Sequence, residues 1–120
     1  MAKEERLRNS SQFRTVYEHG RTWACDFIVL KTLPNNLEYS RYGFVTSKRL
    51  GKAVRRNRVR RLLREAARSV PVIPGWDIVL IARSSAVTAN YQQIKAAVTG
   101  IMHRARILAD KGEANGIGKA

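Results

Sequence analysis

Hydrophobic residues recur along this chain in two patterns, one with helical spacing and one with strand-like alternation or continuous apolar runs. The helical pattern predicts helices over residues 9–20, 53–68 and 90–108. The strand-like pattern predicts extended segments over 23–33, 39–47 and 76–82, of which the last is almost wholly apolar and typical of a buried central strand. The order of helix, strands, helix, strand and helix indicates one α+β domain.

Two of the three predicted helices begin with a capping signal. Asn9 is followed by Gln12 and Asn90 by Gln93, the spacing of a capping box. In the first helix, Phe13, Val16 and Tyr17 share one face, which we expect to anchor the helix to the core.

The middle helix has two distinct sides. Its apolar stripe docks it on the core and consists of Val59, Leu62, Leu63, Ala66 and Val70. A different sector is polar, and we expect Arg60 and Arg64 at the centre of an exposed face there. That sector contains Asn57, Arg60, Arg61, Arg64 and Arg68.

The stretch Lys48–Arg68 is strongly basic, with ten Lys or Arg residues and only one acid, Glu65. Three further arginines, Arg55, Arg56 and Arg58, crowd the first turn of the helix, at the positive end of its dipole. No good N-cap precedes Ala53. Like charges four residues apart repel one another, so this pattern predicts an external polyanion, and RNA is the partner we expect.

Composition narrows the class of protein. The chain has 120 residues, 44% of them hydrophobic, which suits one domain with a real core, and its formal net charge is +14. No apolar run approaches the roughly 18 residues of a membrane span, and the first residues lack the apolar segment of a signal peptide. The single cysteine, Cys25, excludes an internal disulfide. We expect a cytoplasmic protein that binds no membrane.

Candidate catalytic chemistry is absent from the sequence pattern. The nine carboxylates are scattered, and His19 and His103 lie at opposite ends of the chain. No pair of acids shares a predicted face, and no histidines and cysteines have metal-ligand spacing. We therefore predict no catalytic residue and no direct metal ligand in the chain.

The segment Lys52–Arg61, followed by Arg64 and Glu65, closely resembles the RNR signature of the bacterial ribonuclease P protein subunit, with Arg56-Asn57-Arg58 as its core. The resemblance covers about residues 6–108. It implies a ribosomal protein S5 domain 2-like fold: a mixed four-stranded sheet packed with three helices, in the order α-β-β-β-α-β-α, with a crossover through the basic helix. We expect residues 1–110 to form this RNA-binding domain and 111–120 to be a flexible tail.

The resemblance also implies partners and site residues. The RNA subunit would hydrolyse precursor tRNA to remove its 5′ leader, using Mg²⁺ bound mainly by that RNA, and the amide of Asn57 could position an RNA phosphate or a metal-bound water. The residues implied to bind the RNA subunit are Lys48, Arg49, Lys52, Arg55, Arg56, Asn57, Arg58, Arg60, Arg61, Arg64 and Arg68. Those implied to bind the leader are Phe13, Tyr17, Phe27 and Lys31.

Phe27, Val29 and Lys31 share one strand parity and would face the leader, although the family usually has an aromatic residue near Lys31. The charge and fold class also allow a non-enzymatic RNA-binding protein, such as a small ribosomal protein. A DNA-binding groove helix is disfavoured, because no zipper heptads and no helix-turn-helix glycine turn accompany the basic helix.

Overall fold

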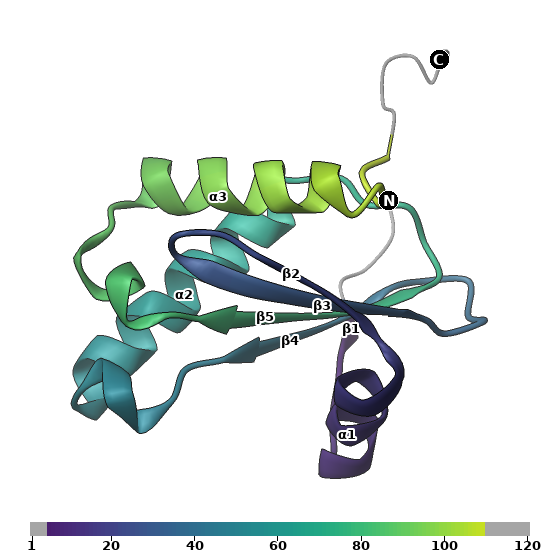
Figure 1. Ribbon diagram of the computed structural model, residues 1–120, viewed down its shortest axis with the longest axis horizontal. Helices are drawn as coiled ribbons and strands as arrows, with labels where there is room; N and C mark the ends of the chain where they lie inside the picture. The colour runs from purple at the N-terminus through teal and green to yellow at the C-terminus, as the bar shows by residue number, and fades with distance from the viewer. Residues whose placement is uncertain (1–4, 110–120) are drawn as a thin grey trace.

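The structure, a computed structural model, describes residues 5–109. Its centre is a mixed sheet with strand order β1-β4-β5-β3-β2 (Figure 1). The strands are β1 (Glu5–Arg6), β2 (Arg21–Ala24), β3 (Ile28–Pro34), β4 (Arg41–Val45) and β5 (Trp76–Ala82). The predicted α+β fold with a four-stranded mixed sheet and three helices is confirmed, and the two-residue β1 is an addition at the edge beside β4.

The three helices are α1 (Ser10–His19), α2 (Ala53–Arg68) and α3 (Tyr91–Arg104), with short 3₁₀ helices η1 (Lys48–Leu50) and η2 (Ser84–Thr88). Helix α2 connects β4 to β5, which pair in parallel, so the predicted crossover through the basic helix is present. The extended segment expected over 23–33 is a hairpin, in which β2 and β3 pair antiparallel around the turn at residues 25–27.

Helices α2 and α3 cover one face of the sheet (Figure 1). The main core lies between them and the sheet, and all of its central side chains are fully buried. They include Ile28 and Leu30 of β3, Ile78 and Leu80 of β5, Val59 and Leu63 of α2, and Ile94 and Val98 of α3. The apolar stripe predicted for the middle helix is therefore the side that packs.

Helix α1 lies on the opposite face of the sheet, where a smaller core forms (Figure 1). Val16 of α1 is fully buried there against Val79 of β5 and Leu7. Phe13 packs beside them, directly over Gly43 of β4, where an added Cβ would collide with the phenyl ring. Because β5 sends alternate residues into both cores, it is buried on both sides, as its apolar run predicted.

The helix starts confirm the capping predictions. Asn9 and Gln12 form a complete capping box at α1, and Asn90 and Gln93 form one at α3. Lys52 precedes α2 and gives it no side-chain cap. The absence of a side-chain N-cap lowers the stability of a helix by about 1 kcal/mol, so the basic helix depends on its packing against the core.

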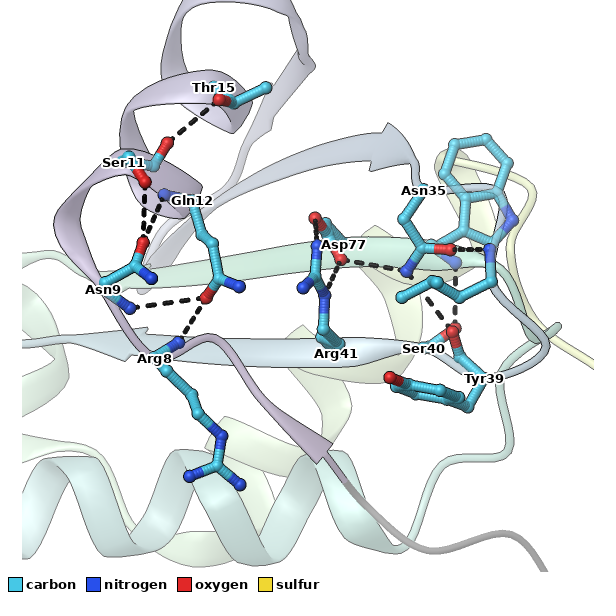
Figure 2. A network of polar contacts seen from close by, with 12 residues as sticks. Arg8, Asn9, Ser11, Gln12, Thr15, Asn35, Tyr39, Ser40, Arg41 and Asp77 are labelled. Carbon is cyan, nitrogen blue, oxygen red and sulfur yellow. Dashed lines mark hydrogen bonds and ion pairs between the residues drawn. The ribbon is translucent and has the colours of Figure 1, made fainter.

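A buried ion pair joins β4 to β5 at the start of the two strands (Figure 2). Arg41 donates from Nε and Nη2 to the two carboxylate oxygens of Asp77, at 2.8 and 2.7 Å. Asn35 donates to the same carboxylate at 2.9 Å. The hydrogen bond to Asp77 raises the pKa of Arg41, so the guanidinium is charged at physiological pH.

No helix among residues 5–109 is long and apolar enough to cross a membrane. The segment after α3 returns alongside the segment after α2, where Val72 and Leu108 form a β-bridge. The tail expected over 111–120 lies outside the described residues.

Candidate nucleic-acid interface

The cations of Lys48–Arg68 differ in how much of each side chain reaches solvent. Lys48, Arg49 and Lys52 are exposed on η1 and the approach to α2. On α2 itself the exposed group comprises Arg55, Asn57, Arg58, Arg61 and Arg68, whereas Arg56, Arg60 and Arg64 are only partly exposed. The predicted polar sector is thus divided between an outward side and a flank that packs against the sheet.

Arg60 lies on that packed flank. Its Nη2 donates to Thr46 Oγ1 at 2.6 Å, just after β4, and its Nη1 donates to Asn57 Oδ1 at 2.9 Å. Thr46 is almost completely buried. The expectation that Arg60 and Arg64 stand at the centre of an exposed face is wrong, because both side chains are only partly exposed and Arg60 is bonded to Thr46 just after β4.

Arg58 is engaged on the other flank of α2. Its guanidinium donates to the carbonyl of Val87 in η2 at 3.2 Å and to that of Ala89, directly after η2, at 3.0 Å. These carbonyls come 29 and 31 residues later in the chain. Arg58 therefore joins the basic helix to the start of α3, a structural contact in addition to its predicted contact with RNA.

A polar hollow of about 360 Å³ lies where the parallel strands β4 and β5 end. Arg49 comes from η1, and Arg83 follows β5 directly. Ser47 and Ser84 also line it. The sequence interpretation did not include Arg83. Its position after a buried strand was the available signal, since the carboxyl ends of parallel strands are a common place for ligand-binding residues.

The α1 face carries a smaller cluster of aromatic and cationic groups. Tyr17 is 44% exposed, and the ammonium of Lys31 lies 5.7 Å from its ring centroid. Lys31 also donates to Thr22 Oγ1 at 2.9 Å. Partial burial raises the pKa of the Tyr17 hydroxyl, so this side chain is neutral at physiological pH. The structure therefore places Tyr17 and Lys31, two of the residues expected at the leader site, next to each other.

The other two residues expected at the leader site, Phe13 and Phe27, lie on different sides of the sheet. Phe13 neighbours the cluster but is partly buried on Gly43. The prediction that Phe27 faces the same side is wrong: Phe27 packs on the α2–α3 core and lines a hollow of about 460 Å³ against α3. Its position explains the error, because it lies in the turn before β3, where strand alternation does not apply.

The described residues contain no group of three or more His, Cys, Asp or Glu side chains that could hold a metal ion. Asn57, the residue expected to position a phosphate or a metal-bound water, uses its amide oxygen to accept a hydrogen bond from Arg60. Within residues 5–109, the candidate interface consists of cationic and aromatic side chains.

Comparison with known proteins gives one consistent family. The family model described as Ribonuclease P matches residues 1–106. The ribonuclease P protein component of Roseiflexus sp. (strain RS-1) is 44% identical, over 96% of this chain and 98% of its own. That of Clostridioides difficile (strain 630) is 42% identical, over 84% of this chain and 91% of its own.

Solved structures agree with the sequence comparison. The RNase P protein of Staphylococcus aureus has a TM-score of 0.80 at 28% identity and covers 88% of this chain and 99% of its own. The RNase P protein of Thermotoga maritima has a TM-score of 0.75 at 29% identity, with 83% and 96% covered.

Proposed function

Because this chain belongs to the ribonuclease P protein family, we propose that it is the protein subunit of a ribonuclease P and binds two RNAs at once. In this proposal, the exposed cations on η1 and α2 bind the catalytic RNA subunit. The cluster of Tyr17 and Lys31 binds the 5′ leader of precursor tRNA. The complex then removes the leader and leaves the mature tRNA 5′ end.

The observation that carries this proposal is the placement of the two clusters on opposite faces of one sheet. Helix α2 lies on one face with α3, and α1 lies on the other (Figure 1). The sheet between them is tied by its ladder hydrogen bonds and by the Arg41–Asp77 pair. A rigid layer with one RNA on each side can hold a substrate strand at a fixed distance from the catalytic RNA.

In this proposal, the positive charge of the α2 face provides its affinity for the RNA subunit. The N-terminus of α2 lacks a side-chain cap and has Arg55, Arg56 and Arg58 in or next to its first turn. Free backbone N–H groups and guanidinium groups there both favour a phosphate. A bound RNA backbone would relieve the repulsion among these cations. In this proposal, RNA binding is the reason that the N-terminus of α2 has no side-chain cap and carries cations at the positive end of the helix dipole.

The leader side uses a different combination of groups. Tyr17 offers an exposed ring for a base, and every base has a face that can stack on it. Lys31 can hold the adjacent phosphate. Phe13 is a supporting residue in this proposal, since its ring is packed on Gly43 and helps to fix the orientation of α1.

Hydrolysis is assigned to the RNA subunit with its bound Mg²⁺. The described side chains do not make a fitting Mg²⁺ site of their own, because such sites use carboxylate oxygens. The role of the protein is to bind and to position. Asn57 remains a prediction as a group near an RNA-bound metal.

A reconstitution assay tests this function. The protein is mixed with a bacterial ribonuclease P RNA and precursor tRNA at low Mg²⁺, and mature 5′ ends are counted with and without protein. We expect cleavage to be slow with RNA alone and to be accelerated by the protein. Tight RNA binding without acceleration would instead favour a structural RNA-binding protein.

A further inference from the structure

A second group of aromatic side chains lies on the α2 side of the sheet. Tyr42 and Phe44 are two residues apart on β4, and their rings are nearly parallel, with 6.1 Å between centroids and 8° between planes. Both are partly exposed and pack against the main core. Arg6 of β1 places its guanidinium 6.0 Å from the centroid of the Phe44 ring. The pair is therefore on the opposite face from Tyr17.

The packed flank of α2 runs along this aromatic pair. Because α2 crosses over between parallel strands, it runs antiparallel to β4. Four residues of helix rise about 6 Å, and two residues of strand rise about 6.6 Å. The contact of Arg60 with Thr46 therefore sets Arg64 at the level of Phe44.

The guanidinium groups on this flank lie close to the protein surface. The Nε atoms of Arg56 and Arg64 are buried and have no hydrogen-bond partner among the described residues. Their side chains thus lie against neighbouring atoms instead of extending into solvent. We call the resulting surface the α2–β4 shelf. It is formed by Arg6, Tyr42, Phe44, Thr46, Arg60 and Arg64.

We propose that the α2–β4 shelf binds one unpaired nucleotide of the catalytic RNA, with its base on the Tyr42–Phe44 pair and its phosphate on the neighbouring arginines. An aromatic floor beside a row of cations is the arrangement that binds single-stranded nucleic acid. This inference rests on the proposed function, and it adds a base contact to a surface that would otherwise recognise only phosphates.

The test uses the double variant Tyr42→Leu/Phe44→Leu, which keeps apolar bulk and removes the flat rings. Affinity for the RNA subunit should fall about 5- to 140-fold for the one stacked base, the equivalent of about 1–3 kcal/mol. The slope of log K against log salt should stay the same, since no charge is removed. Chemical probing should show one base of the RNA subunit that the wild-type protein protects and the variant exposes.

The matched control is Tyr91→Leu, a partly buried aromatic residue of α3 in the same core. Denaturation curves give the folded fraction of every variant. Unchanged affinity in the double variant, or a loss that follows its folded fraction as in Tyr91→Leu, would overturn the proposal. Protection of a base in precursor tRNA in place of the RNA subunit would also overturn it.

The same protein preparation distinguishes this inference from the proposed function. If the wild-type protein assembles with the RNA subunit and accelerates cleavage while the double variant does so equally well, only the shelf is wrong. If the wild-type protein does neither, the proposed function itself fails.

Discussion

The two faces of the sheet present side chains of different kinds to the RNAs that we propose they bind. On the α2 face, exposed cations extend from Lys48 to Arg68, and several arginines are also held by protein groups. On the α1 face, the cluster consists of one exposed aromatic ring and one lysine. Charge acts over a Debye length and is screened by salt, whereas stacking acts only in contact. The first face suits a large folded RNA, and the second suits a single strand.

This difference predicts that salt weakens binding of the RNA subunit much more than it weakens binding of the leader. If five or six exposed cations of the α2 face neutralise phosphates, the slope of log K against log salt for the RNA subunit is about −4 to −5. The single lysine of the α1 face predicts a change of less than about 1 in that slope when a leader is added to the tRNA.

The largest expected effect comes from the ion pair that joins β4 to β5. Asp77→Ala leaves Arg41 without its carboxylate partner in a mostly buried position. Removing one partner of a buried ion pair lowers the free energy of unfolding by about 3–5 kcal/mol. Because Arg41 is partly exposed, we expect a loss near 3 kcal/mol here. Urea denaturation measures it. Glu38→Ala, an exposed acid in the neighbouring loop, should change stability by less than about 0.5 kcal/mol. If Glu38→Ala lowers stability by more than this, the loss of a negative charge, and not the loss of the ion pair, explains the effect of Asp77→Ala.

A smaller effect is expected from Gly43→Ala, which tests the α1 face alone. The added methyl group meets the Phe13 ring, and overpacking of this kind lowers stability by about 1–3 kcal/mol. The ring should shift and weaken leader binding, while affinity for the RNA subunit is kept. The control is Gly100→Ala on α3, where an added Cβ has open space and should stabilise by up to about 1 kcal/mol. Equal stability of the two variants would contradict the packing of α1.

Arg58 and Arg61 test whether the cations of the α2 face have separate structural and RNA-binding roles. Arg58→Ala removes two hydrogen bonds to carbonyls and should lower stability by about 1–2 kcal/mol. Arg61→Ala, an exposed position one turn away, should leave stability unchanged and make the salt slope shallower by about 0.7–0.9. Thermal unfolding and salt titrations of both variants separate the two roles. The reverse pattern would show that the Val87 and Ala89 contacts contribute nothing.

Sequence reasoning succeeded where the signal was local. The capping boxes, the buried strand β5 and the apolar stripe of α2 depend on residues a few positions apart, so periodicity and capping rules found them. The crossover followed from the order of the elements. The strand β1 has two residues and depends on β4, 36 residues later, so nothing in its own segment indicates a strand.

The missed features depend on contacts between distant residues. Arg58 and Val87, Arg41 and Asp77, and Arg49 and Arg83 lie near one another only because the fold brings their elements together. A helical wheel gave the relative angles of Arg60 and Arg64. It could not give the rotation of α2 against β4, which decides which side of the polar sector is packed.

The central claim, that each face holds a different RNA, is tested most directly with Tyr17→Leu in the assembled holoenzyme. Affinity is measured for precursor tRNA with a long leader and for mature tRNA without one. The account predicts a loss of about 1–3 kcal/mol for the leader-bearing substrate only, with assembly unchanged. An equal loss for both tRNAs, or a weaker complex with the RNA subunit, would contradict it.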